Sequence, residues 1–434
     1  MDSKNNTTPI LCSQYQVTPD NRTWTIYLEP NATFSDGTRV TVQDVVASYE
    51  QARQNVYYKG RFTHIARVEL SSDGGVDFFL DTPYQNLALL LDIPIVKASE
   101  VTADNPLGTG PYSLEDGIGG KHLQRVVGWW CSSDDLVAKD SSIALVEAES
   151  PSQIRDEFEF SGLSVVCTNP QTDSYADYRC DFELWEVDSG FMMYVGCNVT
   201  YSKFFDDGTL RTFLTYGIDR QTLVDDNYGG LALPTTLPIS PMSPYYSKSL
   251  ATNYDYDEMR FIDAASKFRV PTNDKGVPRT LQLLVNSDDS ARLRCARNIA
   301  ATLTELGLAC ETVESPTSVY EARLQAANYD IYLGITKLPT TADLSEFYRQ
   351  WGEMSWGGLA NETIYNMVNQ SLADRGNYYN LHKLVADDGR IIPGYYAIYA
   401  KRGVLSDLNP ARDNVFYYTL GKTMESSKVA TQFS

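Results

Sequence analysis

The chain has 434 residues, and at roughly 150 residues per domain this length predicts about three domains or two large ones. Hydrophobic residues make up 43% and charged residues 21%, as in ordinary globular proteins, which excludes a disordered or collagen-like chain. With 36 Lys and Arg against 56 Asp and Glu, the net charge is −20, which argues against nucleic acid or an anionic membrane face as a partner.

The N-terminal part contains clear signals for a strand, a helix and a hairpin. Apolar residues alternate with polar ones over 23–28, which predicts a half-buried strand. Thr41 is followed three residues later by Asp44, a capping-box pattern that starts a predicted helix over 42–52. The segments RVEL and VDFFL flank a Ser-Ser-Asp-Gly-Gly turn and predict a hairpin over 67–80.

The rest of the chain alternates apolar strand patterns with helical ones. A Gly-rich connection at 107–114 leads into a strand, and the helix after 280–287 ends at Gly307. Strand, helix and strand in this order predict parallel βαβ packing. The Pro- and Ser-rich stretch over 233–246 is linker-like in composition. Further strands are predicted over 142–148, 191–199, 280–287, 308–314 and 329–335, and a single helix over 209–224.

Targeting signals and cysteines point to no particular compartment. No stretch reaches the ~18 consecutive apolar residues of a membrane span, and the N-terminus has no signal-peptide pattern. Leu11 stands before Cys12, where a lipidation site needs a small residue. The chain is therefore expected to be cytosolic, or exported with its leader removed. The seven cysteines show no C-x-x-C spacing and are expected to be buried thiols, with a Cys167–Cys180 bridge left open.

Motifs for catalysis, cofactors and metals are missing from the sequence. His64, His122 and His382 each stand alone, without a metal-ligand spacing. There is no Walker A loop and no G-x-S-x-G motif, and Pro111 removes a donor from the Gly108–Gly110 turn. We therefore predict no catalytic residue, no cofactor and no metal site. A glycosidase-like pair of carboxylates remains open.

Five segments, in order, resemble one family. The chain is similar to the extracellular solute-binding proteins of family 5, which serve peptide-type ABC importers of the oligopeptide, dipeptide and nickel group. The resemblance covers nearly the whole chain. The segments are WTIYLEPNATFSDGTRVTVQDVVASYE at 24–50, LGTGPYSL at 107–114, MYVGCNV at 193–199 with FFDDGTLRTFLTYGIDRQTLVDDNYGG at 204–230, YDIYLGI at 329–335 and IIPGYYAIYAKRGV at 391–404.

The resemblance implies an α/β protein with the two-lobed periplasmic-binding-protein type II fold and an extra subdomain in lobe I (cluster C type). The implied boundaries are 1–106 for the extra subdomain with the N-terminal segment, 107–193 for the lobe I core, 194–396 for lobe II and 397–434 for the return to lobe I. The implied function is a monomeric, non-enzymatic receptor outside the cytoplasmic membrane. It would capture a peptide or peptide-like solute between its lobes, deliver it to ABC permease subunits, and meet the membrane through a removed leader or a lipid anchor.

Two departures from the family pattern matter. About twenty residues precede Thr23, so the leader and the opening strand of lobe I are expected to be missing. In the peptide binders an Asp that pairs with the ligand's α-amine follows the YDIYLGI-like strand, whereas this chain reads Ile335-Thr336-Lys337-Leu338-Pro339-Thr340. A buried ammonium needs a compensating charge, so an anionic or neutral ligand becomes more favoured than a peptide held by its N-terminus.

Carried over residue by residue, the resemblance implies a set of ligand-binding residues. Tyr194 and Tyr395 also suit a packed core, Lys337 also suits a solvated loop, and Trp351 could add to an aromatic wall or pack a hairpin. Gly108 and Gly110 are interpreted as a turn with unusual φ, and Asp219 and Arg220 as bracing their helix. The predicted ligand-binding residues are Tyr194, Asn198, Asn286, Thr336, Lys337, Trp356, Tyr395 and Tyr396.

Other functions stay open at this point. A binding protein of the same fold could take an oligosaccharide or a chelated metal. An extracellular hydrolase would use a carboxylate pair, and turnover would distinguish it from a receptor. A ligand-sensing domain of a regulator would need a pair of DNA-binding helices, which the sequence does not show.

Overall fold

The protein is described by a computed structural model that covers 7–55, 58–117, 119–131, 141–148, 150–160, 162–168, 179–180, 183–228, 230–403 and 427–431. It divides into two compact units. Unit 1 comprises Met1–Val187 and Tyr399–Ser434, and unit 2 comprises Asp188–Ile398. Sequence analysis placed lobe II at 194–396, and the finer division of lobe I at residue 107 stays a prediction.

Unit 1 begins with an antiparallel sheet in the order β1-β2-β4-β3. Sequence analysis predicted β2 and the β3–β4 hairpin, but no strand at the position of β1. Helix α1 packs against β3 and β4, and its Tyr49 ring meets the Phe78 ring edge-on, 5.0 Å between centroids. The elements are β1 (Cys12–Val17), β2 (Thr23–Leu28), α1 (Val42–Arg53), η1 (Lys59–Phe62), β3 (Ile65–Leu70), β4 (Val76–Leu80), η2 (Leu87–Leu90) and η3 (Ala98–Glu100).

The start of α1 confirms the predicted capping box. The Thr41 hydroxyl accepts a hydrogen bond from the Asp44 backbone N–H, and the Asp44 carboxylate accepts one from the Thr41 N–H at 2.8 Å. These two bonds satisfy backbone donors that the first helical turn leaves without partners.

A second group of strands completes unit 1. β5, β6 and β7 pair antiparallel, and β15 pairs parallel with both β7 and β8. The C-terminal end of β14 pairs antiparallel with β8. The elements are β5 (Tyr112–Gly117), β6 (Gly120–Arg125), β7 (Ser142–Leu145), α2 (Pro151–Glu159), β8 (Val165–Thr168) and β15 (Ser427–Thr431).

Unit 2 is built on strands in the order β12-β11-β13-β9-β14, with β10 beside β14. β11 is parallel to both β12 and β13, which confirms the predicted βαβ packing, and β13 is antiparallel to β9. β9 and β14 each run from one unit into the other. The strands are β9 (Glu183–Cys197), β10 (Ala232–Pro234), β11 (Leu281–Asn286), β12 (Cys310–Ser315), β13 (Ile331–Lys337) and β14 (Ile391–Gly403).

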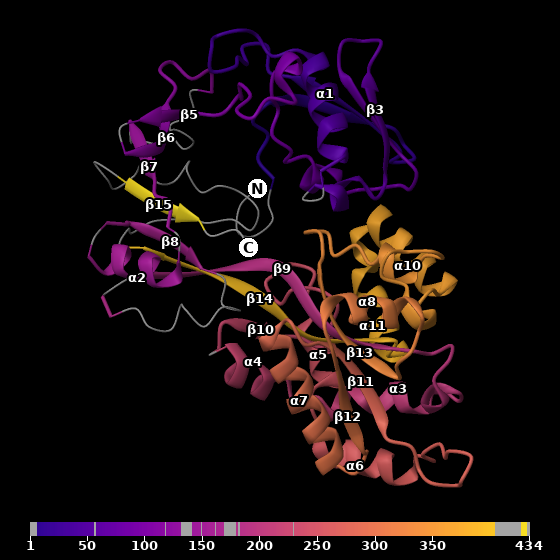
Figure 1. Ribbon diagram of the computed structural model, residues 1–434. Coiled ribbons are helices and arrows are strands. Elements are labelled where there is room, and N and C mark those ends of the chain that lie inside the picture. Colours follow the sequence, from indigo (N-terminus) through magenta and orange to yellow (C-terminus); the bar gives the residue numbers. More distant parts are fainter. Residues whose placement is uncertain are drawn as a thin grey trace. The chain divides into compact units, whose positions relative to one another are not determined.

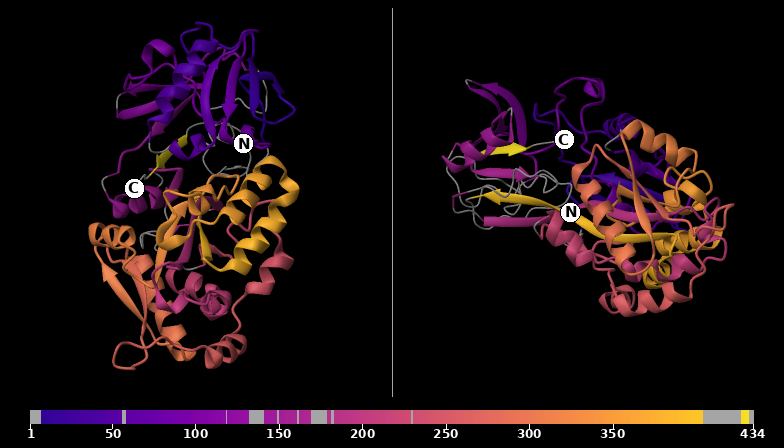
Figure 2. Two further views of the ribbon diagram at one scale, coloured as in Figure 1. Left: turned by 90° about the vertical axis from the view of Figure 1, so that its right-hand side faces the viewer. Right: turned by 60° about the horizontal axis from the view of Figure 1, so that its bottom comes forward.

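Helices cover both faces of these strands (Figure 1). The face with Met193, Val195 and Cys197 packs into one apolar core with side chains of α3, α4, α6 and α7. The other face carries Tyr194, whose ring contacts Phe347 of α9. Figure 2 shows the helices of 345–388, in orange to yellow, gathered together. The helical elements are η5 (Lys203–Phe205), α3 (Thr209–Phe213), η6 (Leu214–Gly217), α4 (Arg220–Tyr228), α5 (Lys248–Ala251), η7 (Thr252–Tyr254), α6 (Glu258–Lys267), α7 (Ser290–Glu305), α8 (Thr317–Gln325), α9 (Ser345–Tyr348), η8 (Trp356–Gly358), α10 (Glu362–Ala373), η9 (Arg375–Asn377) and α11 (Tyr378–Asp388).

The single helix predicted over 209–224 is wrong, because the chain breaks into α3, η6 and α4. Ile218 leaves the helical region at φ −107° and ψ 104°. A Cβ on Gly217 would lie 2.6 Å from the Phe261 ring, so the bend brings backbone against α6. The Asp219 carboxylate then caps α4 by accepting the Thr222 N–H at 3.1 Å, as its predicted bracing role implies.

The linker predicted over 233–246 is also wrong for its central part, because residues 235–240 are buried, whereas Met242 is 42% exposed. Leu237 and Ile239 are 0% and 2% exposed and belong to a small core with Leu250. Threonine hydroxyls satisfy local carbonyls, with Thr235 donating to Leu237 O and Thr236 donating to Ala251 O, each at 2.9 Å. Side-chain hydrogen bonds therefore replace the strand or helix that would otherwise satisfy the buried backbone.

Two smaller expectations need comment. Gly108 and Gly110 do not have the unusual φ that was predicted, since neither has a positive φ. Their turn is held instead by the Thr109 carbonyl, which accepts the indole N–H of Trp129 at 2.8 Å and of Trp130 at 3.0 Å. The Cys167–Cys180 bridge that sequence analysis left open stays untested, because the side chain of Cys167 lies outside the described residues. Cys197 and Cys295 are buried thiols, as predicted.

Candidate functional site

The adjacent strands β9 and β13 bring three predicted ligand residues together in unit 2. Their antiparallel register pairs Tyr194 with Gly334, Met192 with Thr336, and Phe191 with Lys337. Thr336 is half-buried and Lys337 is exposed at the end of β13. The Lys337 ammonium lies 5.9 Å from the centroid of the Phe191 ring. The accessible polar groups of this strand pair therefore lie where β13 ends.

Tyr194 is 1% exposed and packs inside unit 2. Its hydroxyl accepts a hydrogen bond from the Tyr332 hydroxyl at 3.3 Å, and its ring meets the Tyr332 ring edge-on at 5.7 Å. Burial raises the pKa of Tyr194 above its ordinary value, while the Tyr332 hydrogen bond opposes that rise. These contacts give Tyr194 a packing role, and its contact with a ligand stays a prediction.

Two glycines make this tyrosine pair possible. Gly334 stands opposite Tyr194 and Gly196 stands opposite Tyr332, so each ring lies over a glycine of the neighbouring strand. A Cβ on Gly334 would come within 2.6 Å of the Tyr194 ring, and one on Gly196 within 2.3 Å of the Tyr332 ring. The absence of a side chain at both positions leaves the space that the rings fill.

Replacing Gly334 with alanine should therefore lower the free energy of unfolding by about 1–3 kcal/mol, because the buried Tyr194 ring has to move. Urea unfolding followed by circular dichroism measures the effect. Gly60→Ala is the matched control, because nothing lies within 4 Å of a Cβ at Gly60 and its φ is not positive. Equal unfolding midpoints for the two variants would contradict this account of the strand pair.

The two predicted asparagines are engaged within unit 2. Asn198 is 1% exposed; its amide donates to Ala327 O at 2.9 Å and Tyr329 O at 2.8 Å, and its oxygen accepts the Tyr201 N–H at 3.1 Å. The amide of Asn286, at the end of β11, donates to Thr317 Oγ1 at 3.1 Å. Both side chains therefore fix loops at strand ends, and their role toward a ligand stays a prediction.

The remaining predicted residues lie on other elements. Tyr395 of β14 is 1% exposed, and its hydroxyl hydrogen-bonds the Tyr228 hydroxyl of α4. Burial raises the pKa of Tyr395 well above its ordinary value. Tyr396 pairs with Leu233 in the register of β10 and β14, and its side chain lies outside the described residues.

The tryptophan loop approaches Asn198. Trp356 is half-buried in η8, and the next residue, Gly357, accepts the Thr200 N–H at 3.2 Å. A Cβ on Gly357 would lie 3.0 Å from Asn198 Cα, so backbone packs on backbone here. Trp351 is 87% exposed and has a φ of +64°. The structure thus groups Tyr194, Thr336 and Lys337 on one strand pair, and Asn198 with the turn of Trp356.

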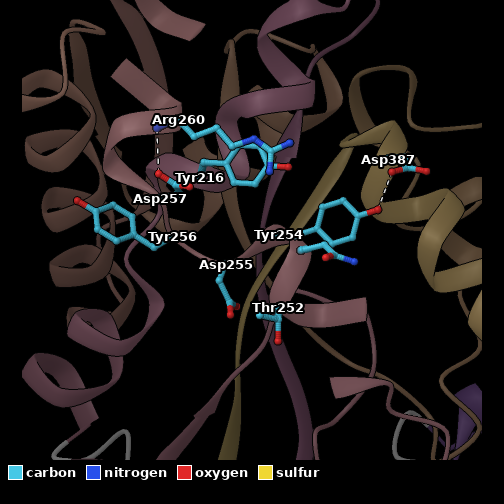
Figure 3. A pocket seen from close by; sticks show the side chains of 9 residues that line it. Tyr216, Thr252, Tyr254, Asp255, Tyr256, Asp257, Arg260 and Asp387 are labelled. Atoms are coloured by element: carbon cyan, nitrogen blue, oxygen red, sulfur yellow. Dashed lines mark hydrogen bonds between the residues drawn. The ribbon is translucent and has the colours of Figure 1, made fainter. Parts of the chain in front are cut away.

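Sequence analysis missed a polar pocket elsewhere in unit 2. It has a volume of about 530 Å³ and lies around the N-terminus of α6. The one sequence signal is the alternation Tyr254-Asp255-Tyr256-Asp257, which belongs to no known motif. The lining residues are Tyr216, Thr252, Asn253, Tyr254, Asp255, Tyr256, Asp257, Arg260 and Asp387 (Figure 3).

Metal-binding and membrane-spanning features were sought over the same residues. Where the structure describes the chain, no three His, Cys, Asp or Glu side chains are grouped so that they could hold a metal ion. Among the described helices, none combines the length and the apolar character needed to cross a lipid bilayer.

A family model decides the relationship of the chain. The model of the bacterial extracellular solute-binding proteins, family 5 Middle, matches residues 6–357. The chain belongs to this family. Family 5 is a family of binding proteins and not of enzymes, as the sequence analysis predicted.

Individual family 5 relatives are distant in sequence. The glutathione-binding protein GsiB of Escherichia coli O6:K15:H31 is 24% identical over 268 residues, which cover 57% of this chain and 50% of that protein. The chain thus spans about half the length of the curated relatives that it matches.

Solved structures share the fold at low sequence identity. A putative peptide-binding protein, AppA of Clostridium difficile, has a TM-score of 0.78 at 16% identity, covering 96% of this chain and 92% of that one. NikA of Brucella suis, solved in complex with Fe(III)-EDTA, has a TM-score of 0.74 at 16% identity, covering 95% and 90%. These similarities confirm the predicted fold class, the α/β type II fold of periplasmic binding proteins.

Proposed function

We propose that this family 5 protein is the substrate-binding component of an ABC importer, capturing a peptide or peptide-like solute and delivering it to a membrane permease. The observation that carries the proposal is the family match over residues 6–357. Supporting it, four of the eight predicted ligand residues lie on or directly after β9 and β14, the strands that run from one unit into the other: Tyr194, Asn198, Tyr395 and Tyr396.

The proposed solute carries an anionic group that pairs with Lys337. The chain has no carboxylate among Ile335–Thr340, so the α-ammonium of a peptide lacks a partner in this segment. Lys337 is exposed at the end of β13, beside the half-buried Thr336, and its side chain ends in an ammonium, a hydrogen-bond donor group. An ammonium and a carboxylate form a charge-assisted hydrogen bond, which is stronger than a neutral one.

Replacing Lys337 with alanine should weaken binding of the imported solute by about tenfold or more, the loss expected for one charge-assisted hydrogen bond. Isothermal titration calorimetry with the solute found by screening measures the change. Lys275→Ala is the control, because Lys275 is an equally exposed lysine in the 271–279 turn of unit 2. Unchanged affinity in Lys337→Ala would remove Lys337 from the site.

A thermal-shift screen tests the function itself. The purified chain is heated with peptide pools, with oligosaccharides and with metal chelates. A ligand present at ~100 times its dissociation constant adds ~2.7 kcal/mol and raises the unfolding midpoint. We expect a rise with peptides or other small anionic solutes. Conversion of the ligand during incubation, or no rise with any class, would contradict the proposed receptor.

The proposal extends to location and partners. The chain would work outside the cytoplasmic membrane as a monomer, and it would meet the permease subunits of its importer there. Sedimentation of the purified chain tests the monomer, and co-purification with the permease tests the partner. A stable dimer would contradict the first statement without affecting solute binding.

A further inference from the structure

The polar pocket at α6 has a lining of mixed charge. Its lining holds three carboxylates, Asp255, Asp257 and Asp387, and one guanidinium, Arg260. Its volume of about 530 Å³ falls within the ~300–1,000 Å³ range of small-molecule sites. All lining residues belong to unit 2, so the site is complete within one compact unit.

Two of the carboxylates already have partners. Asp257 caps α6 by accepting the Arg260 backbone N–H at 2.9 Å. Asp387 accepts the Tyr254 hydroxyl at 2.6 Å and pairs with Lys383 on the same helix. Although desolvation raises the pKa of Asp387, these hydrogen bonds lower it overall, so the carboxylate stays charged and engaged.

Arg260 lines the pocket with its guanidinium stacked on Tyr216. Its guanidinium carbon lies 3.8 Å from the centroid of the Tyr216 ring, so the cation stacks on the aromatic face. Stacking uses the face of the guanidinium, one side-chain hydrogen bond joins it to Tyr216, and its remaining in-plane N–H donors are left for another partner. In the part of the chain that the structure describes, Arg260 makes no ion pair. These donors therefore suit a carboxylate, which a guanidinium binds with two parallel hydrogen bonds.

Asp255 is the third carboxylate of the lining. It is exposed, and within the described ranges it forms no hydrogen bond and no ion pair. Burial lowers the pKa of Arg220 to about 10, and the negative charge of Asp255 opposes this shift. Asp255 therefore favours the charged form of the buried Arg220 guanidinium in unit 2. In Figure 3, Asp255 and Thr252 lie at the opposite side of the view from Arg260 and Tyr216. Tyr256 and Tyr254 lie on the left and right sides of the view, and their rings point away from each other.

We propose that this pocket binds a small zwitterion, an amino acid or a dipeptide with free termini. The ligand carboxylate pairs with Arg260, and the ligand ammonium pairs with Asp255. A simple anion is disfavoured because the lining holds three carboxylates, and a simple cation is disfavoured because it would meet Arg260. A zwitterion satisfies both ends at once.

This site shares no residue with the eight predicted to bind the imported solute, and the inference does not depend on the importer function. Methyl-¹³C-methionine NMR separates the two. Met259 precedes Arg260 on α6 and is 75% exposed; it is outside the pocket lining, so its methyl reports on changes near the start of α6. Met192 stands opposite Thr336 and reports on the predicted solute residues. The Met259→Leu variant assigns the pocket signal.

The probe is glycylglycine, together with its N-acetylated and C-amidated forms. We expect glycylglycine to shift the Met259 signal saturably at millimolar concentration, and each blocked form to bind at least about tenfold more weakly. Arg260→Gln should lose at least about tenfold in affinity. Arg269→Gln, which removes an exposed arginine outside the pocket, should bind like the parent.

Several outcomes would overturn the proposal. They are an absence of any Met259 shift with glycylglycine, equal binding of the blocked forms, and unchanged binding by Arg260→Gln. A Met259 shift with a neutral monosaccharide but not with glycylglycine would replace the zwitterion by a polyol. A shift of Met192 alone would place the dipeptide at the predicted solute residues and leave the α6 pocket without its ligand. Glycylglycine affinity is also compared between Asp255→Asn and the control Asp274→Asn, after both are shown to unfold at the parental midpoint. Equal affinity in these two variants would contradict the pairing of the ligand ammonium with Asp255.

Discussion

Replacing Arg220 with methionine should lower the free energy of unfolding by roughly 3–5 kcal/mol, a large part of the stability of a typical protein. Arg220 is 5% exposed at the start of α4. Its guanidinium donates to Pro393 O at 2.8 Å, to Thr215 O at 3.1 Å, to Ile218 O at 3.2 Å and to Thr215 Oγ1 at 2.8 Å.

The large effect follows from what the guanidinium connects. Thr215 belongs to η6, Ile218 to the break before α4, and Pro393 to β14. One side chain therefore ties the interrupted helical segment to the sheet of unit 2. Methionine has similar length and no donor, so it would leave buried acceptors without partners, at about 1–3 kcal/mol for each.

Arg220→Lys distinguishes the hydrogen bonds from the charge. An ammonium keeps the positive charge but cannot reproduce the planar fork that spans four acceptors, so roughly half of the loss should remain. Urea unfolding measures both variants, with Arg269→Met as an exposed control expected within about 0.5 kcal/mol of the parent. If Arg220→Met unfolds at the midpoint of Arg269→Met, the guanidinium does not hold these elements together.

The features that could be predicted from sequence depend on local chemistry. The capping box of Thr41 and Asp44 is complete within four residues, so its hydrogen bonds follow from the residue types. The hairpin over 67–80 depends on a turn of Asp and Gly between alternating strands, and the structure confirms it. The order of strands and helices in 280–335 likewise determines parallel pairing.

The features that could not be predicted depend on partners far along the chain. The helical segment breaks after Gly217, where the Phe261 ring packs against the backbone, and no local sequence pattern predicts that contact. The segment over 233–246 has the composition of a linker, yet Leu237 is fully buried because Thr235 satisfies nearby carbonyls. Composition does not distinguish a threonine that is solvated from one that replaces a strand partner.

The candidate site shows the same limit. The resemblance drew attention to β9 and β13, but it could not show that Tyr194 and Tyr332 each fill the space above a glycine. The α6 pocket has no recognisable sequence motif, because its lining residues Arg260 and Asp387 are more than a hundred residues apart in the chain. Family resemblance carries over a position in a strand, whereas the direction of a side chain depends on its neighbours in this chain.

Acidification should destabilise the protein through His382, by ~2.7 kcal/mol between neutral pH and pH ~4.5. The imidazole is 0% exposed on α11 and packs against Tyr378, with ring centroids 5.7 Å apart. Among the described residues neither ring nitrogen has a hydrogen-bond partner. Burial lowers the pKa of His382 from 6.5 to about 3, because the charged form loses its hydration.

The sign follows from proton binding. Between pH 6.5 and pH 3 the unfolded chain binds a proton at His382 and the folded chain does not, so stability falls as pH falls through this window. Above pH 6.5 both states are neutral and the contribution is constant. Other groups also titrate here, so the measurement is a difference: urea unfolding of the parent and of His382→Leu at pH ~7 and ~4.5.

His382→Leu should lose less stability on acidification than the parent, by the ~2.7 kcal/mol that two pH units below the unfolded pKa represent. The same loss of stability in His382→Leu as in the parent would show that this imidazole accepts a proton without unfolding its unit. That result would mean that the His382 side chain contacts solvent or a carboxylate in the folded chain and is not buried in its neutral form.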